Sequence, residues 1–160
     1  MLVIADSSAL VALSLCDCLA LLEKLFGEVK VPQAVFDEVC VLNKAESAAL
    51  KAYLAGKVCN VAINTNIEKT NGLGKGELSA ISLYKHMSAD LLLIDDARAR
   101  KVAYLNNLEV MGSLGVLLLA KQKGLIPAIK PYLGRLRCSD IYINENLLDK
   151  VLIMAGESDC

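Results

Sequence analysis

The sequence has no tryptophan, two phenylalanines and one histidine, and aromatic residues make up 4% of its 160 residues. The hydrophobic residues, 55% of the chain, are therefore mainly leucine, valine, isoleucine and alanine. An aliphatic core of this kind is typical of helices packed on a parallel sheet. The single histidine, His86, is expected on a partly exposed helix face, which disfavours a histidine-dependent mechanism.

The sequence also lacks a CxxC pair, and its six cysteines stand mostly among Leu, Val and Ala: Cys16, Cys18, Cys40, Cys59, Cys138 and Cys160. We expect free, buried thiols. The alternative is a metal or redox pair at Cys16-Asp17-Cys18. No second Cys or His pair completes a zinc site with it, so structural zinc is disfavoured.

Long hydrophobic runs are missing as well. No run reaches the roughly 20 residues that a membrane helix needs. The apolar start, Met1 to Ala5, is shorter than the hydrophobic part of a signal peptide. We therefore expect a cytoplasmic protein without membrane contact. No repeat, linker or low-complexity segment divides the chain, which predicts one domain over residues 1–160.

The net charge is only −1, but the charges are unevenly distributed. The segment 97–139 holds a single acid, Glu109, and eight basic residues: Arg98, Arg100, Lys101, Lys121, Lys123, Lys130, Arg135 and Arg137. This polarity favours an acidic metal pocket beside a basic track for a phosphate backbone. Solvated helix faces are the alternative interpretation.

Two apolar segments run directly into acidic residues. Leu91–Ile94 is followed by Asp95 and Asp96, and Leu2–Ala5 is followed by Asp6. Both segments read as strands of a covered parallel sheet. Ligands bind at the carboxyl ends of the strands in such sheets, which makes these acids candidates for a site.

A third acid, Glu38, is expected on a helix that Pro32 opens. Helical spacing places Val35, Val39 and Leu42 on one buried stripe, with Glu38 at its margin facing inward and Asp37 facing water. An acid at the edge of a buried face needs a partner. That partner is either a metal or a neighbouring Lys or Arg.

A fourth acid, Glu77, follows the glycine-rich stretch Gly72–Gly76. This stretch lacks the GxxxxGK[ST] spacing of a phosphate-binding loop, so we interpret its glycines as a tight turn into a helix that starts at Glu77. Helical spacing puts Glu77 on the same face as Ala80 and Ile81, in the first turn, where the helix dipole stabilises an anion. Helix capping alone is the alternative role.

The remaining elements follow from periodicity and turn residues. Further helices are expected over 7–15, with Ser7 or Ser8 as its cap, and over 19–26, 46–54, 97–105, 114–122, 127–136 and 141–154, with Asn144 as a cap. Further strands are expected over 29–31, 57–61 and 108–111. This alternation predicts an α/β fold.

Several carboxylates crowded at the end of a sheet repel one another, so cations or protons must lie between them. Oxygen ligands without Cys or His favour Mg²⁺ or Mn²⁺. Such clusters commonly serve phosphoryl transfer, with a phosphodiester as substrate.

The acids also stand in motifs that resemble the PIN domain, in particular a PIN-like subfamily of nucleic-acid-binding proteins. The motifs are Asp6-Ser7-Ser8, Val31-Pro32 with Val35 and Glu38, Gly74–Ile81, Leu93–Ala103 and Gly112–Leu118. The resemblance extends from Met1 to about Gly156. It implies a three-layer α/β/α sandwich with a central, mainly parallel sheet.

The resemblance further implies a metal-dependent ribonuclease with Mg²⁺ or Mn²⁺. The implied catalytic metal ligands are Asp6, Glu38, Glu77 and one or both of Asp95 and Asp96, with Ser8 in support. Lys75, Arg98 or Arg100 would contact phosphate. Members are often toxins of toxin–antitoxin pairs. We therefore expect RNA and a small antitoxin protein as partners, and a homodimer.

Two positions depart from the family pattern. Many relatives have Thr or Ser two residues before the fourth acid, where this chain has Ile94 if Asp96 is the ligand. Glu77 stands where many have Asp. Both the choice between Asp95 and Asp96 and the number of metal ions therefore stay open.

Two other interpretations remain. The first is a catalytically weak PIN-fold module that binds RNA or protein. The second is an aspartyl phosphatase or receiver domain. It is disfavoured because Ser8 occupies the place of a phosphatase's second acid, and because the acidic pair comes late in the chain.

Overall fold

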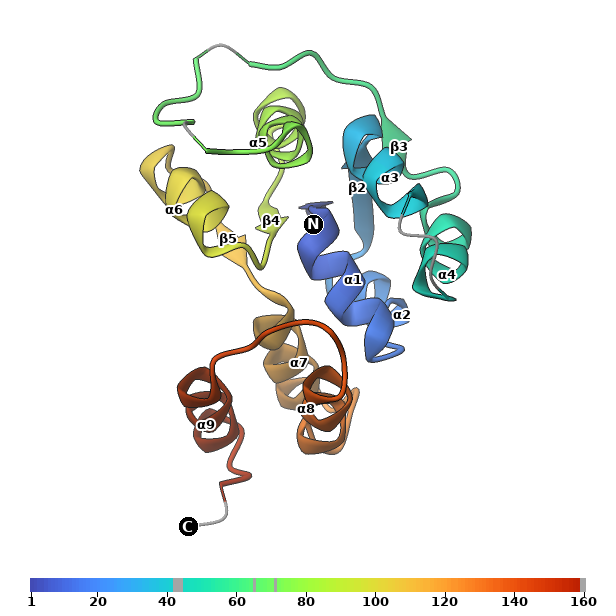
Figure 1. The fold of residues 1–160 in the computed structure, drawn as a ribbon, viewed down its shortest axis with the longest axis vertical. Helices are drawn as coiled ribbons and strands as arrows, with labels where there is room; N and C mark the ends of the chain where they lie inside the picture. Colours follow the sequence, from blue (N-terminus) through green and yellow to red (C-terminus); the bar gives the residue numbers. More distant parts are fainter. Residues whose placement is uncertain (42–44, 65, 71, 159–160) are drawn as a thin grey trace.

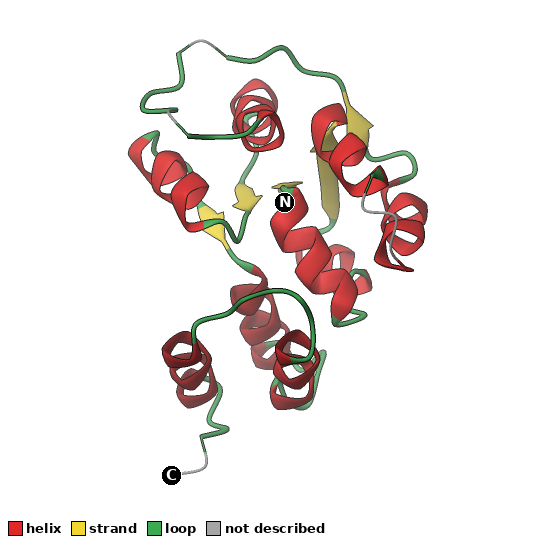
Figure 2. Ribbon diagram, viewed as in Figure 1, coloured by secondary structure: helices red, strands yellow, loops and turns green. Residues whose placement is uncertain are grey.

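A five-stranded parallel sheet forms the centre of the computed structural model, which describes residues 1–41, 45–64, 66–70 and 72–158 (Figures 1 and 2). Its strands are β1 (Leu2–Ala5), β2 (Glu28–Pro32), β3 (Val58–Cys59), β4 (Leu91–Leu93) and β5 (Val110–Met111). They pair in the order β3-β2-β1-β4-β5. The carboxyl ends of β1 and β4, which precede the acidic motifs, are therefore neighbours.

Helices cover both faces of this sheet. They are α1 (Ser7–Leu15), α2 (Ala20–Phe26), α3 (Gln33–Cys40), α4 (Ala45–Leu54), α5 (Lys75–Met87), α6 (Ala97–Leu105), α7 (Ser113–Gln122), α8 (Lys130–Arg137) and α9 (Glu145–Met154). Helices α5 and α6 pack on one face, and α1, α2 and α7 pack on the other (Figure 1). The molecule is thus the predicted α/β/α sandwich. Among the described residues, no helix has the length and apolarity needed to cross a membrane.

The strand side chains explain this layering. In β4, Leu91, Leu92 and Leu93 are all buried. Because successive strand residues point to opposite faces, Leu91 and Leu93 join the core under α1 and α7, and Leu92 joins the core under α5 and α6. A strand covered on both faces reads as a continuous hydrophobic run, as predicted here.

The first helix corrects one prediction. Asp6, rather than Ser7 or Ser8, is the N-cap of α1, because its backbone is extended and its carboxylate accepts from the Ser8 amide. Ser8 already lies within the helix, in its first turn. The acid that ends β1 therefore also starts the following helix.

Helix α5 begins two residues earlier than predicted. Gly74 is its N-cap, and Lys75 is its first residue. Gly72 has a φ of +86°, a conformation that favours glycine, so it supplies the turn before the helix. The prediction of a tight glycine turn is right, but Gly76 lies inside the helix and has another role.

The C-terminal elements are shorter than predicted. Helix α9 begins at Glu145 instead of Ile141, because Asn144 is its N-cap and accepts from the Asn146 amide at 2.8 Å. Helix α8 begins at Lys130 instead of Pro127. Residues 138–144, here called the connector, join the two helices and arch over α7 in Figure 1.

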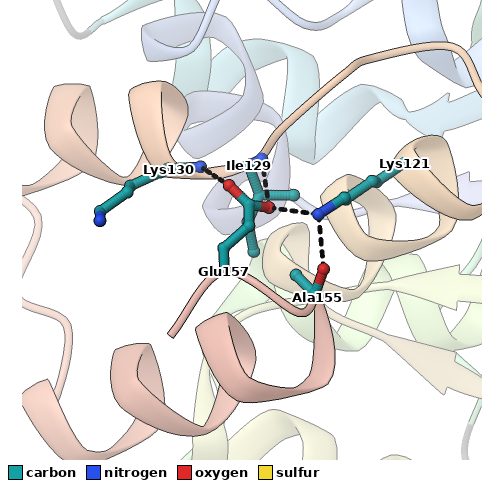
Figure 3. Close-up of polar contacts among 5 residues, drawn as sticks. All are labelled: Lys121, Ile129, Lys130, Ala155 and Glu157. Atoms are coloured by element: carbon teal, nitrogen blue, oxygen red, sulfur yellow. Dashed lines mark hydrogen bonds and ion pairs between the residues drawn. The ribbon is translucent and has the colours of Figure 1, made fainter. Parts of the chain in front are cut away.

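A half-buried carboxylate fixes the end of α9 (Figure 3). Glu157 accepts hydrogen bonds from the Lys121 ammonium at 2.9 Å and from the backbone amides of Ile129 and Lys130 at 2.9 and 3.1 Å. Lys121 also donates to the Ala155 carbonyl. This cluster, here called the clasp, ties the chain after α9 to α7 and to the start of α8.

The described cysteines are free thiols. Cys16 and Cys18 are buried as predicted, whereas Cys138 is exposed, and Cys160, like Leu42 of the predicted stripe, lies outside the described residues. Burial raises the pKa of Cys16 to about 12 and of Cys18 to about 11. Both stay protonated at neutral pH, which disfavours the metal or redox pair.

Candidate active site

The sheet topology places the acidic motifs after β1 and β4 side by side. Ala5 pairs with Leu93, and the Asp6 amide donates to the Leu93 carbonyl at 2.8 Å. Asp6 and the pair Asp95-Asp96 therefore leave the sheet at the same edge.

Ser8 connects these two strand ends. Its hydroxyl donates to Oδ2 of Asp6 at 2.8 Å and accepts from the Asp95 amide at 3.0 Å. The direction of the hydroxyl proton is thereby fixed. Ser8 thus holds one oxygen of Asp6 and leaves the other without a hydrogen bond from any described residue.

Asp6 is the most perturbed acid of the site. It is 2% exposed, and its Oδ1 is buried without a hydrogen-bond partner among the described residues. Burial raises its pKa to about 6. The hydrogen bonds from Ser8 oppose this rise, and repulsion from Glu38 and Glu77 adds to it. Asp6, Glu38 and Glu77 are therefore close enough to interact electrostatically.

Glu38 reaches the site from α3. Its Oε2 accepts from the Ser7 hydroxyl at 2.7 Å, and its carboxylate lies against Gly76 of α5. A Cβ on Gly76 would lie 2.0 Å from Oε1 of Glu38, so only glycine leaves room for this carboxylate. Glu38 is more exposed than the predicted inward orientation implies, while Asp37 faces water as predicted.

Glu77 lies in the first turn of α5, as predicted. Its Oε2 accepts from the Gly74 amide, which caps the start of the helix. Capping and the position near Asp6 thus occur together rather than as alternatives.

Asp95 and Asp96 hold two different helices. Asp95 is half-buried and accepts from the amide and the hydroxyl of Ser113, both at 2.6 Å, at the start of α7. Asp96 is exposed and caps α6, where its Oδ1 accepts from the Ala99 amide at 2.9 Å. Both oxygens of Asp95 are therefore engaged, whereas the second oxygen of Asp96 has no partner in the described chain.

A hollow of about 390 Å³ lies over these groups and is here called the acidic hollow. It is lined by Ser7, Ser8, Val11, Glu38, Asp95, Asp96 and Ile141. The connector contributes Ile141, so residues from four separate parts of the sequence form its wall. Asp6 and Glu77 interact with each other, but neither lines this hollow, and Asp6 lies buried behind Ser8.

The predicted phosphate-binding residues lie around this hollow, not in it. Lys75 is exposed at the start of α5 and lines a separate hollow with Gln33 and Asp37. Arg98 donates to the Gly72 carbonyl at 3.3 Å. Arg100 lies near Gly112 in a hollow adjacent to the acidic one.

The donor chemistry of the site fits a hard divalent cation. All candidate ligands are carboxylate oxygens, and Oδ1 of Asp6 has no partner in the described structure. As the side chains stand, no three acids, histidines or cysteines of the described residues converge on one point. Glu38 and Glu77 hydrogen-bond to Ser7 and Gly74 instead, so both would have to turn toward Asp6 to share an ion.

Three residues that contact the predicted acids were not themselves predicted to be site residues. Ser7, Ser113 and Gly76 each contact one of the predicted acids across the fold. Ser113 and Gly76 stand inside the family-like motifs, but no local pattern assigns them to Asp95 or Glu38.

A covered parallel sheet, with acids and a hollow at the carboxyl ends of its central strands, defines the class of α/β proteins that bind ligands at this edge. Within this class, the chain belongs to the PIN domain family, because the model of the family DUF3368, described as a PIN domain, matches residues 2–157. PIN domains are generally nucleases. A search of curated proteins found no match.

Proposed function

We propose that the protein is a metal-dependent endoribonuclease that hydrolyses RNA phosphodiesters. One observation supports this most strongly: the buried Asp6 keeps Oδ1 unpartnered while the charges of Glu38 and Glu77 repel it. Such an arrangement stores unfavourable electrostatic energy, which a divalent cation would relieve. The structural role of Asp6 as a helix cap does not require its second oxygen to be buried and free.

Asp6, Glu38, Glu77 and Asp96 are the proposed ligands of Mg²⁺ or Mn²⁺. Both Asp95 and Asp96 line the acidic hollow, but Asp96 is preferred because one of its oxygens has no partner among the described residues, whereas both oxygens of Asp95 hold Ser113. When bound, the ion supplies positive charge that activates water and offsets the charge of the phosphate.

The chain's own residues then have distinct tasks. Ser8 orients Asp6 by binding Oδ2, and Ser7 holds Glu38 at the rim of the hollow. Asp95 positions the start of α7 beside the site. Because the pKa of Asp6 is raised to about 6, cation binding and cleavage should both increase as the pH rises through this value.

Cleavage of a labelled single-stranded RNA with Mn²⁺, and with EDTA in its place, tests the proposal. Two neighbouring substitutions on α3 form a matched pair. Glu38→Gln should abolish cleavage, whereas Asp37→Asn, in an exposed side chain that pairs with Gln33 at 2.8 Å, should leave it unchanged. Equal cleavage by both variants would refute the assignment.

The binding-module alternative predicts a different outcome. Wild-type protein would then retain RNA or a protein partner without cutting RNA in Mn²⁺. The described acids do not converge on one point, and this observation favours the binding-module alternative. Wild-type cleavage that Asp6→Asn removes would exclude it.

The biological role follows from the family resemblance alone. We propose that the protein is the toxin of a toxin–antitoxin pair, silenced by a small antitoxin, and that it forms a homodimer. Expression should arrest growth, and Glu38→Gln should relieve the arrest. Light scattering on the purified protein checks for the mass of a dimer.

A further inference from the structure

A second hollow of about 370 Å³ adjoins the acidic hollow and is here called the flanking groove. Its walls come from α6, β5, the start of α7, the connector and α9. They include Arg100, Met111, Leu114, Tyr142, Ile143 and Leu147. Asp95 and Ile141 line both hollows. The two hollows are therefore adjacent parts of one surface depression.

Arg100 gives the flanking groove an unpaired positive charge. Its guanidinium lies over Gly112, where a Cβ would come within 3.4 Å of Nη1. Arg100 is half-buried, and its guanidinium makes no hydrogen bond or ion pair with any described residue. The other arginines, Arg98, Arg135 and Arg137, are hydrogen-bonded to Gly72, Cys16 and Glu145. A partly desolvated cation without a partner favours an anionic ligand.

Apolar and aromatic side chains form the rest of the flanking groove. Met111, Leu114 and Ile143 are half-buried. Tyr142 is 89% exposed on the connector, although the groove lies beside it. A flat aromatic ring next to an apolar hollow and a cation matches the features that proteins use for unpaired nucleotides, in which bases stack on aromatic rings and arginine contacts the phosphate.

We propose that the flanking groove binds the nucleotide next to the cleaved phosphodiester of a single-stranded RNA. Its base stacks on Tyr142 and contacts Met111 and Ile143, and its phosphate pairs with Arg100. This placement beside the cleavage point rests on the proposed nuclease function. A duplex cannot enter in this way, because its bases are stacked and paired inside the helix.

Binding without metal tests the groove separately from catalysis. Fluorescence anisotropy with a labelled ten-nucleotide single-stranded RNA in EDTA measures affinity when no cleavage occurs. Tyr142→Ala should weaken binding about 5- to 150-fold, the range for loss of one base stack, whereas Tyr142→Phe should retain it. Arg100→Gln should weaken binding about 10-fold or more, because a charged hydrogen bond to phosphate is lost.

Tyr104→Ala is the matched control. Tyr104 is a 60% exposed tyrosine on α6, outside the flanking groove. Its removal should change affinity less than twofold. Unchanged binding by both Tyr142→Ala and Arg100→Gln would overturn the proposal, as would equal affinity for a duplex of the same length.

Cleavage kinetics separate this proposal from the nuclease function itself. If the enzyme cuts RNA, Tyr142→Ala should raise KM and leave kcat nearly unchanged. Cleavage with an unchanged KM refutes the groove and preserves the nuclease. Groove-dependent binding without any cleavage refutes the nuclease and preserves the groove. Loss of a dimer in Tyr142→Ala, with RNA binding intact, would assign this surface to a second copy and also overturn the proposal.

Discussion

At the residue scale, the site depends on close approach between side chains that belong to different helices. The carboxylate of Glu38 occupies the space where any residue other than glycine at position 76 would place its Cβ. Glu38 is also exposed, so its side chain has solvent to turn into. Position 76 therefore controls the location of the Glu38 carboxylate, a proposed metal ligand, without controlling the fold.

Gly76→Ala should remove cleavage activity and leave the protein folded. The new Cβ would displace the flexible carboxylate of Glu38 rather than any backbone, and alanine is favoured over glycine in a helix by about 0.5–1 kcal/mol. We expect an unchanged or higher Tm in thermal unfolding together with loss of RNA cleavage. Full activity in a stable Gly76→Ala protein would contradict the assigned position of Glu38.

Asp6 links the charge of the site to stability. Its folded pKa of about 6 lies above the ordinary value, so the folded state holds the proton more tightly than the unfolded state. Stability should therefore fall as the pH rises from about 4 through about 6. Each pH unit between the two pKa values corresponds to about 1.4 kcal/mol, so ionisation destabilises metal-free protein by up to about 3 kcal/mol.

Asp6→Asn should remove this pH dependence. Denaturant unfolding in EDTA should give a variant that is more stable than wild type at pH 7.5 and equal to it at pH 4. Mn²⁺ should stabilise the wild type but not Asp6→Asn, because the variant lacks the ligand charge. A variant less stable than wild type at pH 7.5 would show that burial does not strain the carboxylate.

The sequence identifies the candidate acids and their location at the sheet edge, but it does not predict which side chains they contact. Asp6, Asp95 and Asp96 follow apolar strands, so their location at one edge of the sheet follows from parallel topology. The contact between Glu38 and Gly76 joins two helices through a missing side chain, and periodicity carries no information about such a contact. The difference between Asp95 and Asp96 likewise depends on Ser113, a neighbour only in the folded chain.

At the element scale, the clasp determines where the last helix lies. Burial acts to raise the pKa of Glu157, but hydrogen bonds from Ile129, Lys121 and Lys130 and the charge of Lys121 outweigh it and lower the pKa. The ionised form is thus favoured in the folded protein. Its contribution to stability is present above the ordinary pKa of glutamate and is lost as the pH falls through the lowered value.

Glu157→Gln should destabilise the protein by about 1–3 kcal/mol at pH 7, the range for charged hydrogen bonds, and by less under acid conditions. Glu145→Gln is the control. It breaks only an exposed pair at 3.1 Å between Glu145 of α9 and Arg137 of α8, which should change stability little. Denaturant unfolding at pH 7 and pH 3.5 measures both. Equal stability of the two variants would show that the clasp does not hold α9.

Element boundaries were predictable where local chemistry sets them. Helix α6 spans Ala97–Leu105 as predicted, because Asp96 caps one end and the apolar period stops at the other. Helix α9 was predicted to start at Ile141, whose apolar character continues the helical pattern. In the fold, Ile141 instead lines the acidic hollow, and tertiary packing overrides the pattern there.

At the scale of the whole molecule, the basic segment is less available than its composition suggests. Lys121 pairs with Glu157, Arg137 pairs with Glu145, and Arg135 donates to the Cys16 carbonyl at 2.9 Å. These charges support the C-terminal helices. The predicted continuous basic track for a phosphate backbone is therefore interrupted, and Arg100 remains the unpaired arginine of the described chain.

RNA binding should consequently depend only weakly on salt. Each phosphate contact to a single strand contributes a slope of about −0.7 to the dependence of log K on log salt. We expect a total slope between about −0.7 and −2 for the wild type. The slope for Arg100→Gln should be about 0.7 closer to zero. Anisotropy titrations between 50 and about 300 mM salt measure it. A slope near −5 would instead indicate an extended cationic surface.

The connector belongs to a different part of the fold from the carboxylates. Its Ile141 borders the acidic hollow and its Tyr142 borders the flanking groove, yet it belongs to no strand of the sheet. Under the proposed function, substitutions at these two positions should change which RNA sequences bind, because they leave the carboxylates and the sheet that carries them intact.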